Sequence, residues 1–177
     1  KDGVFPYRVE QAEYQENWLR LWLRTDKEAT ERFGAPGLAV VTYRFGEELQ
    51  VELEWFGKDE NRIPEGLFFG MNLDYKTGAP LTLSKLDLPI DPYHVREGGN
   101  RKLHVSPVIR GGKGTVQSLH APLVSVGGRH LYDENEGYGQ AEDGMYYLLC
   151  NNRWGTNFPL WYGENARFVF HISLDKE

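Results

Sequence analysis

The chain has 177 residues, of which 40% are hydrophobic and 14% aromatic, so it can bury a core as one domain. Its 20 basic and 26 acidic residues give a net charge of −6, which argues against a nucleic-acid-binding surface. No apolar run approaches the roughly 20 residues of a membrane-spanning helix. We therefore expect neither a nucleic-acid nor a membrane partner. The single cysteine, Cys150, excludes an internal disulfide.

Residues 9–32 are predicted to form an α-helix, within a helical lead-in segment that covers residues 1–36. The stretch "VEQAEYQENWLRLWLRTDKEATERF" contains neither Pro nor Gly. Steps of three and four residues give it one apolar face, made of Tyr14, Trp18, Leu21, Trp22 and Thr25. Gly34 and Pro36 then end the helix. We interpret the Trp side chains as packing the helix onto a neighbour, with stacking on a sugar as the alternative.

Residues 37–177 are predicted to form an antiparallel β-sandwich domain. "LAVVTYRF" and "LQVELEWF" alternate as strands do, and about six further strand-like runs follow between glycine-rich turns. No alternation of strands with helices occurs, which argues against a parallel α/β fold. The sequence thus indicates a mainly β protein with one N-terminal helix.

The stretch "NNRWGTNFPLWY", which begins at Asn151, combines side chains that suit a carbohydrate site. Trp and Tyr rings stack on the apolar faces of sugars, and Asn amides both donate and accept hydrogen bonds. The same composition is typical of a tight corner between two strands, where Asn satisfies the backbone and Trp fills space. Both interpretations stay open, with the structural corner preferred.

Signals for catalysis are weak. Glu65 in "NRIPEGLFF" is the acid best placed to be held firmly, although it could simply pair with Arg62. The five His residues form no zinc motif, and the acidic stretch 133–144 does not match a calcium loop. No nucleophile elbow or phosphate-binding loop is present.

Four stretches in the same order resemble a group of proteins related to the family 38 glycoside hydrolases, the α-mannosidase-like enzymes. These are "GKDENRIPEGLFF", "GGNRKLHVSP", "SLHAPLVSVG" and "NNRWGTNFPLWYGENARFVFHI". The resemblance implies that the chain is the end of a helical segment plus a C-terminal β-sandwich of the galactose-mutarotase-like supersandwich type. It also implies a catalytic barrel, absent from this sequence, that would hold zinc. No catalytic residue or zinc ligand can be carried over to this chain.

The resemblance leads to a first hypothesis, in which the chain is a non-catalytic domain that supports the barrel and edges the carbohydrate cleft. The expected partners are then carbohydrate and the N-terminal barrel of the parent protein, and an apolar face should be left uncovered. The candidate carbohydrate-binding residues are Asn151, Asn152, Trp154, Asn157, Trp161 and Tyr162, followed by Arg101 and His104.

Two alternatives remain. The chain could be a stand-alone carbohydrate-binding module with a groove lined by Trp154, Trp161 or Tyr162. It could also be a mutarotase-like or lyase-like enzyme, which would need Arg101, His104 and Glu65 within about 10 Å of one another. Whether this chain is itself an enzyme is therefore an open question at the level of the sequence.

Overall fold

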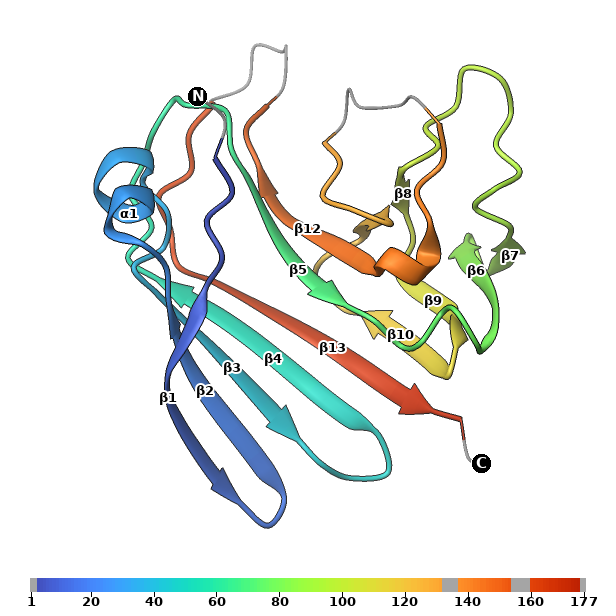
Figure 1. The fold of residues 1–177 in the computed structure, drawn as a ribbon, viewed down its shortest axis with the longest axis horizontal. Coiled ribbons are helices and arrows are strands. Elements are labelled where there is room, and N and C mark those ends of the chain that lie inside the picture. Colours follow the sequence, from blue (N-terminus) through green and yellow to red (C-terminus); the bar gives the residue numbers. More distant parts are fainter. Residues whose placement is uncertain (1–2, 132–136, 154–159, 176–177) are drawn as a thin grey trace.

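The computed structural model describes residues 3–131, 137–153 and 160–175. Within these residues, two antiparallel β-sheets pack face to face, and a single α-helix lies near the N-terminus (Figure 1). This confirms the expected fold class, a mainly antiparallel β-sandwich with one helix. No helix in the described ranges is long and apolar enough to cross a membrane.

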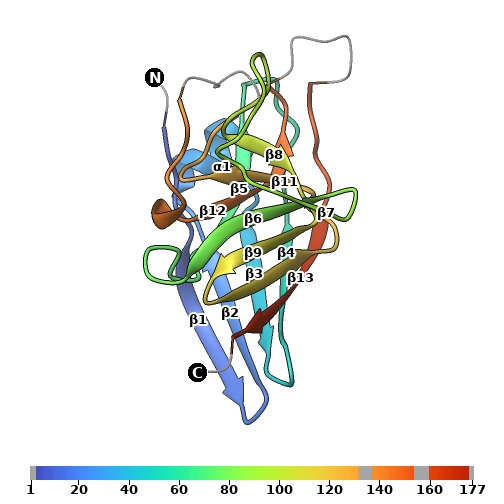
Figure 2. The same cartoon turned by 90° about the vertical axis from the view of Figure 1, so that its right-hand side faces the viewer.

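In the part of the chain that the structure describes, the larger sheet has nine strands and the smaller sheet four. The order in the larger sheet is β1 (Arg8–Gln15), β2 (Trp18–Arg24), β3 (Leu38–Arg44), β4 (Leu49–Phe56), β13 (Ala166–Leu174), β10 (Gly114–Ser118), β9 (Val108–Gly112), β6 (Ala79–Lys85) and β7 (Leu88–Ile90). The order in the smaller sheet is β5 (Gly66–Met71), β12 (Met145–Asn151), β11 (Leu123–Val126) and β8 (Leu103–Val105). The β1–β2 hairpin and β7 lie on opposite sides of the molecule in Figure 1, and Figure 2 looks onto the side that carries β7.

The predicted helix over residues 9–32 is wrong for most of its length. Residues 8–24 form the β1–β2 hairpin, and only α1 (Lys27–Phe33) is helical. Every second residue of β2 is Leu, on one face, while Trp18, Arg20 and Trp22 lie on the other, and this two-residue period is that of a strand. Gly34, with φ of 67°, ends α1 in the left-handed conformation that glycine favours.

The core lies between the two sheets. Phe170 of β13 contacts Phe69 of β5 and Tyr147 of β12, with ring centroids 5.2 and 4.9 Å apart. Trp55 of β4 packs on Phe168 of β13 at 5.1 Å. Burying such large rings supplies much of the stabilisation of a sandwich, because each removes 150–250 Å² of surface from water.

The inner face of the larger sheet becomes steadily more exposed toward its β1 edge. Val51, Tyr43, Leu19 and Tyr14 lie side by side on β4, β3, β2 and β1. Val51 is 1% exposed, Tyr43 and Leu19 are half-buried, and Tyr14 is 82% exposed. On β1, Val9 is also 54% exposed. The smaller sheet therefore covers β4 and leaves the apolar inner face of β1 open.

Candidate functional site

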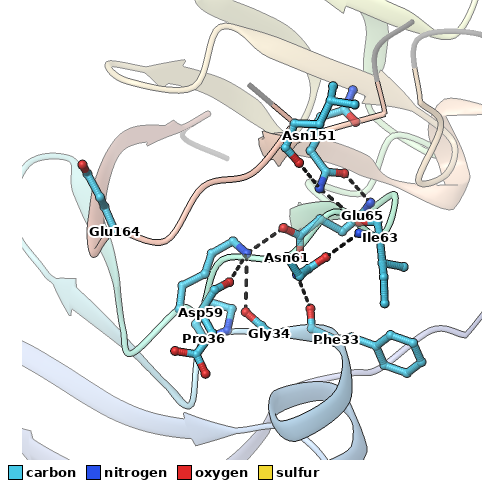
Figure 3. A network of polar contacts seen from close by, with 12 residues as sticks. Phe33, Gly34, Pro36, Asp59, Asn61, Ile63, Glu65, Asn151 and Glu164 are labelled. Carbon is cyan, nitrogen blue, oxygen red and sulfur yellow. Dashed lines mark hydrogen bonds and ion pairs between the residues drawn. The ribbon is translucent and has the colours of Figure 1, made fainter. Parts of the chain in front are cut away.

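The chain crosses between the two sheets at one end of the sandwich, close to α1. Residues 57–65 connect β4 to β5, and residues 152–165 connect β12 to β13. We call the described parts of these two connections the corner. Figure 3 shows the polar network there. The corner brings together two stretches that are distant in the sequence, "GKDENRIPEGLFF" and the beginning of "NNRWGTNFPLWY".

A buried ion pair lies in the middle of the corner. Lys58 Nζ is 2.6 Å from Glu65 Oε1, and the two side chains are 0% and 14% exposed. The ammonium also donates to the carbonyl oxygens of Gly34 and Asp59, both at 3.4 Å (Figure 3). Glu65 is therefore firmly held, as the sequence predicted, but its partner is Lys58 and the proposed pairing with Arg62 is not the one observed.

Asn152 binds three main-chain groups of the corner. Its Oδ1 accepts a hydrogen bond of 2.7 Å from the Glu65 amide, and its Nδ2 donates to the carbonyl oxygens of Ile63 and Leu160, each at 3.0 Å. The Asn152 amide N–H donates to the Glu65 carbonyl at 3.2 Å. Asn152 is only 8% exposed, and its side chain satisfies main-chain hydrogen-bonding groups of both connections. This supports the interpretation of Asn152 as part of a structural corner between strands.

A second asparagine links the corner to the helix. The Nδ2 of Asn61 donates to the Phe33 carbonyl at the end of α1, and its Oδ1 accepts from the Ile63 amide at 2.8 Å. Carbonyls at a helix end lack partners within the helix, so Asn61 satisfies one of them. Lys58 and Asn61 both lie in the stretch "GKDENRIPEGLFF", but neither belongs to a recognised chemical motif, so their residue types alone did not single them out.

The aromatic candidates lie at the rim of the corner. Trp161 is 41% exposed, and the Arg62 guanidinium lies 4.8 Å from its ring centroid. Tyr162 is half-buried and packs against the core. Asn151 accepts a hydrogen bond from the Arg153 amide at 2.8 Å. Trp154 and Asn157 lie outside the described residues, and the carbohydrate role of all these residues stays a prediction.

Arg101 and His104 belong to a different part of the fold. His104 lies on β8 and Glu65 directly precedes β5, and these two strands form opposite edges of the smaller sheet. Three strand spacings of about 4.8 Å put β5 and β8 about 14 Å apart. Arg101 lies 5.4 Å from the ring centroid of Tyr138. The cluster that a stand-alone enzyme would need is therefore not assembled.

Burial changes the pKa of one titratable group in each of these two regions. Burial, reinforced by nearby Lys85, lowers the pKa of His104 to about 4, so this imidazole is neutral at pH 7. Burial raises the pKa of the Cys150 thiol, the opposite of what an activated nucleophile requires. In the described ranges, no three His, Cys, Asp or Glu side chains come together as a metal site would require.

No protein-family model matches the chain, and no curated protein sequence matches it either. Among solved structures, YeaD of Salmonella typhimurium, described as a candidate mutarotase, superposes with a TM-score of 0.40 at 11% identity over 97% of this chain. The protein HI1317 gives a TM-score of 0.39 at 11% identity over 96% of this chain. The chain spans 65% of the length of each of these two structures.

Proposed function

We propose that this chain is the C-terminal β-sandwich domain of a larger protein related to the α-mannosidase-like family 38 glycoside hydrolases. In this role it is non-catalytic alone, packs against the catalytic barrel and edges the carbohydrate cleft. The resemblance of four sequence stretches motivates the proposal. Two of these stretches meet in the corner, and the other two supply the paired strands β8 and β11.

The observation that carries the proposal is the uncovered inner face at the β1 edge. A row of apolar side chains that begins in the core at Val51 continues through Leu19 to Tyr14, which is 82% exposed. A contiguous apolar surface of this kind favours contact with another protein surface. Trp18 and Trp22, which the helical interpretation placed on such a face, instead lie half-buried on the outer face with Arg20 between them.

The polar groups of the corner support a non-catalytic role. The Lys58 ammonium and the Glu65 carboxylate neutralise each other, and the Asn152 amide is occupied by the backbone. A general acid or base must instead be able to reach a substrate proton. The corner is therefore better suited to hold the two sheets together than to transform a substrate.

The proposal is tested by the mass of the native polypeptide that carries this sequence, measured by mass spectrometry in the source cell. A mass several times 20.4 kDa is expected, and a mass near 20.4 kDa would refute the proposal.

Hydroxyl-radical footprinting of the native protein then tests whether another protein surface covers the inner face of β1. Tyr14 should be protected relative to the isolated chain, whereas Leu86, which is 98% exposed on the β6–β7 hairpin, should be oxidised equally in both.

A second function, carbohydrate binding by the chain alone, is favoured by one observation. The Trp161 ring is 41% exposed, and Arg62 lies over it, so an aromatic surface and a hydrogen-bond donor occur side by side. Such a pair suits the apolar face and the hydroxyls of a sugar. Trp161→Ala should then abolish oligosaccharide binding by the isolated chain, measured by calorimetry. An unchanged affinity would exclude this site.

A further inference from the structure

A depression separate from the corner lies at the opposite end of strands β5 and β12. Its volume is about 350 Å³, and it is lined by Gly70, Met71, Asn72, Asp143, Gly144 and Tyr146. The corner adjoins Gly66 and Asn151, whereas the depression adjoins Met71 and Met145, which pair across the same two strands. Five strand residues at about 3.3 Å each separate the two places by about 17 Å.

One wall of the depression is a tyrosine ring in a fixed position. Tyr146 lies directly opposite Gly70 across the two strands, and a Cβ atom added to Gly70 would be 3.0 Å from the ring. The Tyr146 hydroxyl donates to the Asp143 carbonyl at 3.2 Å, and the Arg129 guanidinium lies 5.7 Å from the ring centroid. Gly70 therefore leaves room for the ring to lie close to the strand.

The other side of the depression is polar and held in place. Asn72 Nδ2 donates to the Glu142 carbonyl at 3.1 Å, and its Oδ1 accepts from the Asp74 amide at 2.9 Å. These bonds fasten the short 3-10 helix η1 (Ala141–Asp143) beside β5. The Asp143 carboxylate is exposed, and no cationic side chain of the described ranges forms an ion pair with it.

Strand β5 adds main-chain hydrogen-bonding groups to the depression. β5 is an edge strand and pairs with β12 alone in the described sheet, so its outer edge presents main-chain N–H and C=O groups beside Asn72. The Asp143 carboxylate accepts hydrogen bonds, the strand edge both donates and accepts them, and the Tyr146 ring is apolar, so together these groups match a sugar. Sugar hydroxyls donate and accept hydrogen bonds, and sugar C–H faces are apolar.

We propose that this depression binds one neutral sugar unit. Its volume is near the lower end of the about 300–1,000 Å³ of ligand pockets, which suits a monosaccharide. Asp143 and the adjacent Glu142 would repel an anionic sugar. This binding does not depend on a place in a larger protein, so its failure would leave the proposed domain role untouched.

The test is a titration of the isotope-labelled 177-residue chain, followed by amide chemical shifts. The probes are methyl α-mannoside and methyl β-glucoside at up to about 50 mM, well above a millimolar Kd, with glucuronate as the anionic comparison. The expected result is saturable movement of the Gly70 and Gly144 amides with at least one methyl glycoside. Glucuronate should bind at least ten-fold more weakly.

Variants then separate the depression from the corner. Asp143→Ala should weaken binding at least ten-fold while its amide spectrum keeps the native dispersion, and the matched variant Glu28→Ala, an exposed acid on α1, should bind as the original chain does. The proposal is overturned if the Gly70 and Gly144 amides do not move, if glucuronate binds equally well, or if Asp143→Ala has no effect. Movement confined to residues around Trp161 would also overturn it and assign the sugar to the corner.

Discussion

Replacing Glu65 by Gln gives the sharpest test of how the corner is held together. Gln preserves the shape of the side chain but leaves the Lys58 ammonium without its counter-charge. The Lys58 side chain is 0% exposed, so water cannot replace the carboxylate. The two remaining acceptors, at 3.4 Å, are beyond the roughly 2.9 Å of a strong hydrogen bond. We therefore expect a loss of about 3–5 kcal/mol in the free energy of unfolding.

The measurement is urea unfolding at pH 7, followed by Trp fluorescence and extrapolated to water. The matched control is Glu28→Gln in the exposed pair with Arg32, which should lose less than about 1 kcal/mol. The double variant Lys58→Met/Glu65→Leu should recover most of the loss, because it leaves no buried charge unpaired. If Glu65→Gln costs no more than Glu28→Gln, the ion pair does not stabilise the corner.

Three further substitutions test single groups. Asn152→Ala removes the side chain that hydrogen-bonds three main-chain groups, and it should lower the free energy of unfolding in urea by about 2–3 kcal/mol. A loss below about 1 kcal/mol would contradict a structural role for Asn152. Tyr147→Phe should stabilise the fold by about 1 kcal/mol, because the buried hydroxyl bonds to no described group; destabilisation would show that it has a partner. Because the pKa of His104 is about 4 when folded, against about 6.5 when unfolded, the unfolded chain binds more protons between these values. Stability should therefore fall by up to about 3 kcal/mol from pH 6.5 to 4, and His104→Leu should flatten that slope.

The β-sandwich could be predicted from the sequence because apolar and polar residues alternate along its strands. This two-residue period is typical of a half-buried strand. The β1–β2 hairpin could not be predicted, because Trp18 and Trp22 are four residues apart and fit both a strand and a helix. The stretch also contains Glu, Gln, Lys and Arg, which are good helix formers, and it lacks Pro and Gly, so its composition favoured the helix. Pairing of β2 with β3 along its length overrides that propensity, and pairing between distant segments is not visible in a local pattern.

Some residues of the candidate site could be predicted from the sequence, but the residues that they contact could not. The sequence singled out Glu65 and Asn152, and the structure joins them by a hydrogen bond across 87 positions of the chain. Lys58 belongs to no recognised motif, so the sequence did not indicate that it is buried against Glu65. That contact depends on how the connections between the two sheets fold together. Glu65 and His104 were both candidates for one catalytic cluster, yet they lie at opposite edges of the smaller sheet.

An Asn side chain has a fixed number of hydrogen bonds to offer, and this decides between the two interpretations of "NNRWGTNFPLWY" for each residue separately. Asn152 Nδ2 uses both of its donors on Ile63 and Leu160, so it has none left for a sugar. Trp161 keeps an exposed ring and has no such commitment. Stability and sugar binding in the corner should therefore separate by residue: Asn152→Ala should unfold the corner, whereas Trp161→Ala should leave stability within about 0.5 kcal/mol and change only ligand affinity. If Trp161→Ala destabilises the chain as much as Asn152→Ala, the whole stretch is a structural corner and sugar recognition has to lie elsewhere in the fold.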